Sequence, residues 1–168
     1  MVKYADGPRT DVEIEIDAPT SDVWPLLVDI ELPARVSPEL RTAEWIDDGP
    51  AEGATLRGYN QHPRVGEWDV RCTGTGFTSG SAFEWTVGDP ANKTARWRFD
   101  LAPLGADRSA LRFSAEMGPG PSGLTPMIAR MPEREDDIVA NRLADWNANM
   151  QLTVDGIAAL AEGREPAS

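Results

Sequence analysis

The sequence predicts an α+β fold in which one antiparallel sheet packs against helices on a single side. Apolar residues recur at alternating steps of four and three through residues 133–162, which is typical of one long amphipathic helix. Upstream, seven segments alternate apolar and polar residues and are separated by turn residues, which is typical of antiparallel strands. The two patterns together predict the element order β-α-α-β6-α.

Composition limits the class of protein. The chain has 168 residues, of which 40% are hydrophobic and 26% charged, so we expect one folded domain over residues 1–168. Its core is expected at about 10–162, with a frayed tail at 163–168. The net charge of −12 argues against nucleic acid or an anionic membrane as the main partner, because like charges repel.

Targeting and metal-binding signals are missing from the sequence. No apolar run approaches the roughly 18 residues of a bilayer span, so no stable membrane insertion is expected. Residues 1–8 lack signal-peptide character and Cys72 is the single cysteine, which favours the cytoplasm. Since His62 is likewise the single histidine, we expect no metal site, and no nucleotide-binding or nucleophile-elbow motif occurs. No cofactor is expected.

The first elements are a strand and two short helices. Residues 11–16 alternate strictly and predict a strand with one solvated face. Asp22 is the expected N-cap of the next helix, because Pro25 is tolerated only in a first helical turn. Residues 29–36 predict a second short helical segment before the chain becomes extended.

Six further strands follow at hairpin spacing. In the later strands, apolar and aromatic residues alternate with charged ones, so one face is dry and the other is solvated. Glu84, Arg96, Arg98 and Arg112 fall on the solvated face, as do Arg57 and Tyr59 in an earlier strand. The six predicted strands span residues 40–46, 55–62, 67–77, 81–87, 94–102 and 110–117.

The C-terminal pattern is long enough to cross a whole sheet. A helix of roughly 30 residues spans about 45 Å, and its apolar stripe must be buried against an element of similar length. The stripe mixes a tryptophan, a methionine and a threonine with aliphatic residues, a composition that suits a pocket wall as well as a core. Its members are Val139, Leu143, Trp146, Met150, Thr153, Ile157 and Leu160.

Several motifs resemble the START-like or SRPBCC superfamily, in particular its bacterial branch of polyketide cyclases/dehydrases and lipid transport proteins. The similarity covers about residues 10–162 and implies a helix-grip fold, with two short helices after the first strand. In that fold a curved seven-stranded antiparallel sheet wraps around the long C-terminal helix and leaves a deep cavity. Pro25 departs from the family, which usually has a helix former there. The motifs are Ala18-Pro19-Thr20-Ser21-Asp22-Val23-Trp24, Asp29, Pro33, Ser37-Pro38, Gly53, Gly66-Glu67-Trp68 and the terminal helix.

Under this fold the inward-facing residues become candidate ligand contacts. Each of them alone has the simpler interpretation of a core residue, but four tryptophans directed at one space, with Gly58 in mid-strand, are typical of an apolar ligand site. The candidates are Leu56, Gly58, Trp68, Val70, Phe83, Trp85, Trp97, Phe99, Phe113, Leu124, Met127, Leu143, Trp146 and Met150.

Asn60 and His62 are the candidate catalytic residues. Both share the inward parity of Gly58. Asn60 either orients a ligand or bonds to a neighbouring element, because a buried amide needs a partner. His62 is the one side chain whose ordinary pKa lies near neutrality, so it is either a general acid or base, or an exposed turn residue. On the helix, Asn147 and Asn149 flank Trp146, and either one reaches the cavity or both face solvent.

The Gly/Pro-rich stretch at 117–132 is too long for a routine turn. Two interpretations stay open: a lid that brings Leu124, Met127, Ile128 and Met131 to the ligand, and a passive crossover between the last strand and the helix.

Two functions remain open at this stage. The first is a cyclase/dehydrase-like enzyme that binds a polyketide-like intermediate and shapes its ring closure by proximity and orientation. The second is a carrier of a lipid, quinone or other hydrophobic metabolite that catalyses no reaction. An enzyme needs a group that transfers protons, whereas a carrier needs only apolar surface and one polar anchor.

Overall fold

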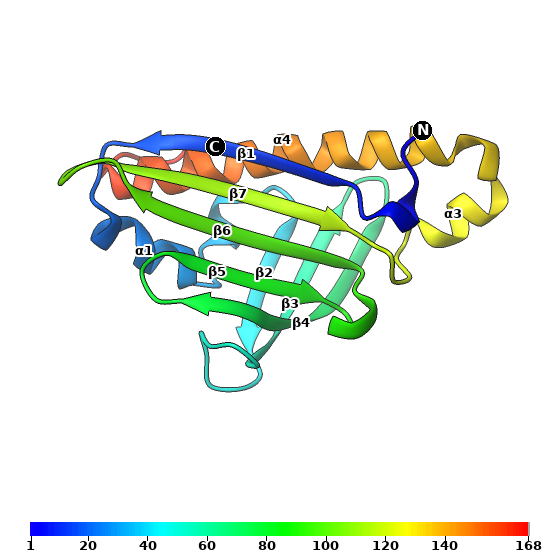
Figure 1. Ribbon diagram of the computed structural model, residues 1–168, viewed down its shortest axis with the longest axis horizontal. Coiled ribbons are helices and arrows are strands. Elements are labelled where there is room, and N and C mark those ends of the chain that lie inside the picture. The colour runs from blue at the N-terminus through cyan, green and yellow to red at the C-terminus, as the bar shows by residue number, and fades with distance from the viewer. Residues whose placement is uncertain (168) are drawn as a thin grey trace.

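The computed structural model describes residues 1–167, and Ser168, the end of the predicted tail, lies outside the described residues. All seven predicted strands form, in one antiparallel sheet of order β1-β7-β6-β5-β4-β3-β2. The helix-grip fold is therefore confirmed (Figure 1). The strands are β1 (Arg9–Ile16), β2 (Leu40–Trp45), β3 (Thr55–His62), β4 (Gly66–Thr78), β5 (Ala82–Val87), β6 (Ala95–Pro103) and β7 (Ser109–Met117).

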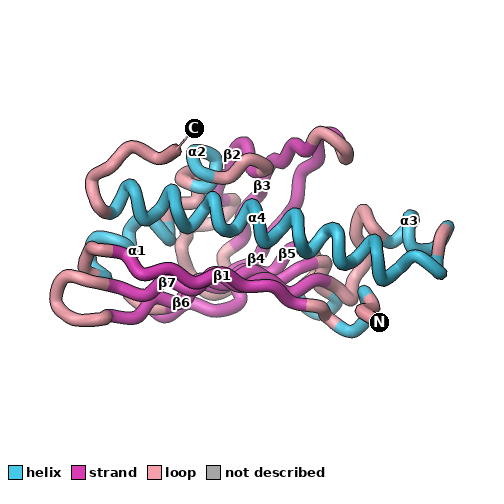
Figure 2. The backbone as a smooth tube through the Cα atoms, turned by 90° about the horizontal axis from the view of Figure 1, so that it is seen from above, coloured by secondary structure: helices cyan, strands magenta, loops and turns pink. Residues whose placement is uncertain are grey.

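The helices lie on the concave side of this sheet. Figure 2 shows the sheet curving around the long helix α4 (Glu135–Ala161), with β1, β6 and β7 on one side of it and β2 and β3 on the other. None of the helices in the described part of the chain is both long and apolar enough to cross a membrane. The shorter helices are α1 (Thr20–Val28), α2 (Pro33–Val36), α3 (Thr125–Arg130) and the 3₁₀ turns η1 (Tyr4–Asp6), η2 (Pro90–Asn92) and η3 (Pro132–Arg134).

The start of α1 differs from the prediction. The helix begins at Thr20, and the carbonyl of Pro19 accepts the amides of Asp22 and Val23, so Asp22 lies inside the first turn and is not the cap. Pro25 is consequently one turn deeper in the helix than expected. The second short helix is also shorter than predicted, because Pro33 starts it and residues 29–32 form turns.

The main core lies between α4, α1 and the β1–β7–β6 part of the sheet. Five members of the predicted α4 stripe are buried and the other two, Leu143 and Leu160, are partly buried. The hydroxyl of Thr153, the one polar member, donates to the carbonyl of Asn149 at 2.9 Å. The stripe therefore packs as the periodicity predicts, and its polar group is satisfied within the helix.

The short helix α2 contacts α4 at Gly156. A methyl group added there would lie 2.6 Å from Cγ1 of Val36, closer than atoms pack. This glycine therefore sets how closely α2 and the start of β2 approach the C-terminal half of α4.

Gly156→Ala is expected to destabilise the protein. Overpacking against Val36 costs about 1–3 kcal/mol, which the better helix propensity of alanine offsets by up to about 1 kcal/mol. We expect a net loss of about 1–2 kcal/mol in the free energy of unfolding, measured by urea denaturation. Gly123→Ala is the matched control, because no atom lies within 4 Å of the added methyl. Equal stabilities of the two variants would contradict the close α2–α4 contact.

Cys72 is buried in β4 on the concave face, and burial raises the pKa of its thiol from 9.0 to about 12. The unfolded chain loses this proton above about pH 9, whereas the native protein keeps it. The contribution of this thiol to the free energy of unfolding is therefore fully present below pH 9 and is lost as the pH rises toward 12. Burial also raises the pKa of Tyr4, which acts in the same direction.

We expect native Cys72 to resist a thiol reagent such as 5,5′-dithiobis(2-nitrobenzoate) at pH 8, and the urea-unfolded chain to react within minutes. Cys72→Ala should also lose less stability between pH 8 and 10 than the wild type, as measured by urea denaturation. Rapid labelling of the native protein would show that the thiol is accessible.

Candidate functional site

A continuous row of aromatic side chains crosses the concave face of the sheet from α1 to α4. Trp24 on α1 packs on Phe77, and Phe77 on Phe83. The row continues through Trp85 to Phe113 and Phe99. It ends where Trp97 on β6 meets Trp146 on α4, with ring centroids 4.7 Å apart. The closest pair in the row is Phe99 and Phe113, which stack at 4.3 Å.

The sheet register explains why these rings meet. Phe83 pairs with Phe99 and Trp85 with Trp97 across β5 and β6, and Phe99 pairs with Phe113 across β6 and β7. Residues paired directly across antiparallel strands share one face. The three strands therefore assemble one aromatic surface from positions two residues apart.

Phe77 belongs to this row although its position in the strand pattern assigns it to the other face. A bulge at Thr75 shifts the β4–β5 register between Gly74 and Gly76. The extra residue reverses the alternation, which turns Phe77 inward. The hydroxyl of Thr75 bonds on the outer face to Glu84 at 2.8 Å and Thr86 at 3.0 Å. The bulge thus adds one ring to the row.

The row is only partly enclosed. Phe83, Phe99, Phe113 and Met150 are buried, whereas Trp85 and Trp97 are partly exposed although they lie near the middle of the concave face. Trp68, Val70 and Leu143 are also partly exposed. Within residues 1–167, no tryptophan N–H donates a hydrogen bond to a protein group. Every buried side-chain nitrogen or oxygen in these residues does have a hydrogen-bond partner, so the tryptophan N–H groups are not fully buried and keep access to solvent.

The β3 candidates lie on the inner face, as their parity predicts. Leu56 and Gly58 are buried, and Gly58 is covered by Leu40 and Val70, whose methyl groups would lie 3.3 and 3.5 Å from an added Cβ. Asn60 pairs with Trp68 across β4 and with Leu40 across β2. Its amide is partly exposed and makes no side-chain hydrogen bond within the described residues.

His62 lies at the end of β3, where its Nδ1 accepts the backbone N–H of Arg64 at 3.1 Å. In the neutral ring, inferred from this bond, the proton is therefore on Nε2. In this tautomer Nε2–H is a hydrogen-bond donor, and Nδ1, the nitrogen that could take a proton, is occupied until the contact with Arg64 breaks. Arg64 of the same turn binds Asp145 on α4 at 2.7 Å, so the β3–β4 turn reaches the helix.

A polar cluster beside the row was not predicted from the sequence. Glu39, in the connection between α2 and β2, accepts two hydrogen bonds from Arg142, at 2.6 and 3.2 Å, and one from Asn149 at 3.2 Å. The guanidinium carbon of Arg142 lies 5.8 Å from the centroid of the Trp146 ring. Asn147 instead donates to the hydroxyl of Thr10 on β1 at 2.8 Å.

The Gly/Pro-rich stretch contains α3 and is fixed at its beginning. The carbonyl of Gly120 accepts the hydroxyl of Tyr4 at 2.7 Å, and its amide donates to the carbonyl of Lys93 at 2.7 Å. Beyond this point Leu124 is partly buried against the core, whereas Met127 is 44% exposed. Of the four predicted lid residues, Leu124 and Ile128 thus pack against the core, Met131 is partly exposed and Met127 lies at the surface.

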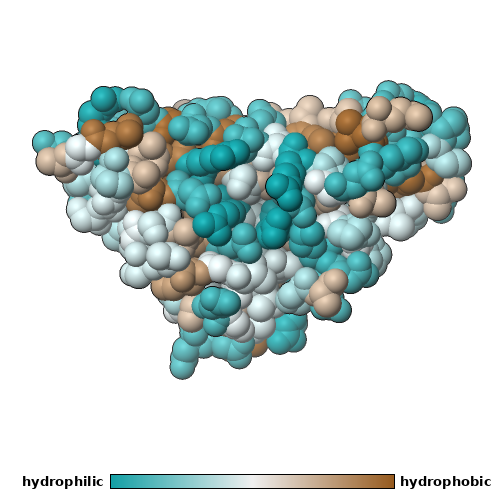
Figure 3. All heavy atoms as spheres, viewed as in Figure 1, coloured by the Kyte–Doolittle hydropathy of each residue, from teal (hydrophilic) through white to brown (hydrophobic). Residues whose placement is uncertain are grey.

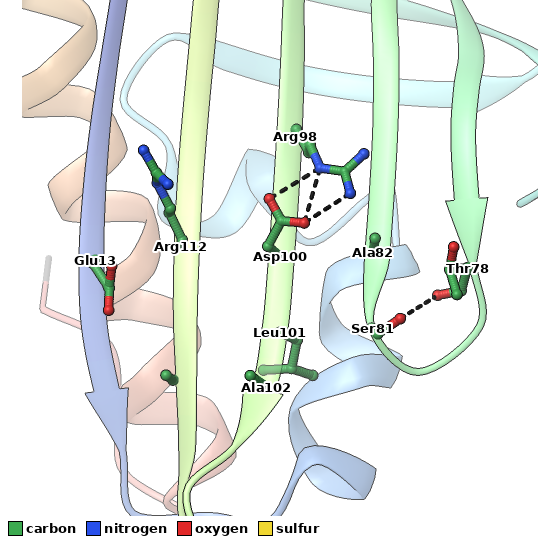
Figure 4. Close-up of a pocket in the computed structure, with 10 residues that line it drawn as sticks. Glu13, Thr78, Ser81, Ala82, Arg98, Asp100, Leu101, Ala102 and Arg112 are labelled. Carbon is green, nitrogen blue, oxygen red and sulfur yellow. Dashed lines mark hydrogen bonds and ion pairs between the residues drawn. The ribbon is translucent and has the colours of Figure 1, made fainter.

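Two surface hollows lie away from the middle of the row. One, of about 410 Å³, is on the outer face of the sheet and includes Glu13, Arg98, Asp100 and Arg112, as Figure 4 shows. Figure 3 shows the polar side chains that gather on this side of the molecule. The other, of about 290 Å³, lies between residues 28–31 and β2 and includes Trp45, whose ring is 6.4 Å from Phe83 of the row.

The outer face carries the charged residues predicted for it. Glu116 binds Arg9, Lys93 and Arg96 at 2.6–2.7 Å. Burial alone raises the pKa of Glu116, but hydrogen bonds from Lys93 and Arg96 and their charges lower it below its usual value. Arg98 and Asp100 form a further pair at 2.8 Å. These charged groups therefore satisfy one another.

Solved structures with this fold include a polyketide-cyclase-like protein and two aromatase/cyclases. A polyketide-cyclase-like protein of Corynebacterium glutamicum is 26% identical, with a TM-score of 0.64 over 92% of this chain and 91% of that one. The Zhui aromatase/cyclase of Streptomyces sp. R1128 is 16% identical, with a TM-score of 0.67 over 92% and 93%. A di-domain aromatase/cyclase of steffimycin biosynthesis is 11% identical, with a TM-score of 0.71 over 92% of this chain and 50% of that one.

No curated protein matches the chain. A family model described as polyketide cyclase/dehydrase and lipid transport matches residues 8–151. Since this match covers most of the sequence, the chain belongs to the polyketide cyclase/dehydrase and lipid transport family.

Proposed function

We propose that the protein binds a polyketide-like or similarly apolar small molecule between the concave face of the sheet and α4, and promotes its cyclisation or dehydration. The observation that carries the proposal is the aromatic row from Trp24 to Trp146, whose central tryptophans keep solvent access. Aromatic walls with a few polar groups are the usual composition of small-molecule sites. Family membership and the aromatase/cyclase structures with the same fold support the ligand class.

Within this proposal the rings supply shape and the polar residues supply chemistry. A flat ligand that stacks on Trp85 and Trp97 is held in a folded conformation, which brings its reacting carbons together. Ring closure then moves a proton from the attacking carbon to the carbonyl oxygen, and dehydration releases one water. Asn60 is the proposed hydrogen-bond donor to that oxygen. His62 is the proposed proton shuttle: Nδ1, once released from the Arg64 amide, takes the proton from the attacking carbon, and the resulting imidazolium returns a proton to the oxygen from Nε2.

The second candidate function is a carrier of lipid, quinone or another hydrophobic metabolite without chemistry. The bond between the Arg64 amide and Nδ1 of His62 favours it, because this contact holds the imidazole in the turn as an ordinary structural group. Binding is common to both candidates, so it is tested first.

Binding is tested with the neutral fluorescent probe N-phenyl-1-naphthylamine. We expect saturable fluorescence enhancement with the wild type, and about three- to tenfold weaker binding by Trp97→Leu, because this change removes a ring from the middle of the row. Tyr59→Leu is the control, since Tyr59 lies on the outer face and is 39% exposed. Thermal melts establish that both variants are folded. Absence of binding to the wild type, or equal loss in both variants, would refute the proposed site.

Catalysis is tested with a linear poly-β-keto thioester, following cyclised and dehydrated products by liquid chromatography and mass spectrometry. We expect the wild type to increase the rate of product formation, and His62→Ala and Asn60→Ala each to lower turnover at least tenfold. Arg64→Ala is the control for the turn, because it removes the ion pair with Asp145 but keeps the backbone amide. Unchanged turnover in both site variants would exclude the catalytic roles of Asn60 and His62. A wild type that does not increase the rate of product formation would favour the carrier.

A further inference from the structure

An enclosed ion pair joins α4 to the segment just before β2. The side chains of Arg142 and Glu39 are only 16% and 15% exposed, and the carboxylate accepts from both terminal nitrogens of the guanidinium. Asn149, two helical turns farther along, donates to the same carboxylate. The pair is therefore shielded from solvent, unlike the neighbouring pair of Arg64 and Asp145, in which the arginine is 70% exposed.

The position of this pair on α4 places it beside the aromatic row. Gly156 of the same helix edge meets Val36 of α2, and Arg142 and Asn149 both reach Glu39, so this edge faces the α2–β2 side of the sheet. The guanidinium lies over the Trp146 ring, and Trp146 contacts Trp97. Arg142 is thus the charged group that borders the α4 end of the row.

Arg142 has donors left over. A guanidinium carries five N–H groups, and in the described residues Arg142 uses one from Nη1 and one from Nη2, both toward Glu39. The Nε–H and one N–H on each terminal nitrogen have no acceptor there. The Nε atom keeps contact with solvent, since no buried side-chain nitrogen of the described residues lacks a partner. A charge-assisted hydrogen bond from such a donor to a ligand oxygen is stronger than a neutral one.

Asn60 adds a second unpaired polar group nearby. It is paired in the sheet with Leu40, the residue after Glu39, and the amide of the next residue, Gln61, donates to the carbonyl of Glu39 at 2.9 Å. The β2–β3 edge therefore brings the Asn60 amide to the same side of the fold as the ion pair.

We propose that Arg142 is the polar anchor of the site: its free N–H groups bind an oxygen acceptor, carbonyl or carboxylate, on a planar apolar ligand that stacks along the aromatic row. Glu39 is a positioning residue, which holds the guanidinium over the Trp146 ring and partly neutralises its charge. This inference rests on the proposed binding function and adds the chemistry that the ligand carries at one end.

The test compares two probes of similar size, 2-naphthoate with an anionic oxygen acceptor and 2-ethylnaphthalene without one, by quenching of tryptophan fluorescence. Arg142→Gln should weaken binding of 2-naphthoate about tenfold, because a hydrogen-bonded charge is lost. It should change the affinity for 2-ethylnaphthalene less than threefold. Arg64→Gln is the matched control, since it removes the same charge at the exposed rim and should leave both affinities unchanged.

Glu39→Gln separates anchoring from a structural role. Removing the carboxylate charge leaves Arg142 uncompensated, so binding of 2-naphthoate should become tighter, opposite in sign to the effect of Arg142→Gln. If the two residues only support packing, Glu39→Gln and Arg142→Gln should each weaken the binding of both probes. Circular dichroism and thermal melts establish that each variant is folded, and Arg142→Lys, which keeps the charge, should retain part of the preference for 2-naphthoate.

Each outcome has one meaning. Opposite effects of the two substitutions on 2-naphthoate, with 2-ethylnaphthalene nearly unchanged, support the anchor. Equal weakening of both probes by Arg142→Gln, or wild-type binding of 2-ethylnaphthalene without 2-naphthoate, overturns the anchor and leaves the proposed binding function standing. If the wild type binds neither probe nor N-phenyl-1-naphthylamine, the binding function itself fails, and the anchor with it.

Discussion

The packing of α4 along β1 is the constraint on which the rest of the structure depends. A single helix covers only a few strands, because neighbouring strands lie about 4.8 Å apart and a helix with its side chains is about 10–12 Å wide. The buried stripe of α4 completes the core with β1, β6 and β7. The strands on the other side of the sheet must contact α4 in other ways. Large aromatic rings and long charged side chains are concentrated there.

The aromatic row and the ion pairs join these strands to α4 in different ways. The aromatic row lines the space between β5, β6 and α4 with rigid surfaces whose stacking is favourable without polar partners. The ion pairs of Glu39 with Arg142 and of Arg64 with Asp145 tie the β2–β3 edge to α4 through long side chains. Side-chain bridges of this kind can lengthen or reorient at lower cost than an interdigitated core.

Most of the fold was predictable because its signals are local. Alternation located all seven strands, and the α4 stripe followed from its 3.6-residue period. The bulge at Thr75 was not predictable, since one extra residue reverses the parity of Phe77 without changing composition. The ion pair of Glu39 and Arg142 was not predictable for another reason: the two residues are 103 positions apart and meet only through the tertiary fold. The start of α1 was misplaced because three consecutive polar residues are all suitable caps, and a backbone carbonyl takes the role instead.

The first residues of the chain act as a strap across three parts of the molecule. The hydroxyl of Tyr4 donates to the carbonyl of Gly120, and the backbone amide of Tyr4 donates to the carboxylate of Glu135 in the first turn of α4. The ammonium group of Lys3 binds the same carboxylate at 2.8 Å. The N-terminus therefore lies beside the start of α4 and close to α3 (Figure 1). A mechanical link thus runs from the sheet edge to the segment between β7 and α4, so any protein or peptide fused before residue 1 would act on the region that carries Leu124 and Met127.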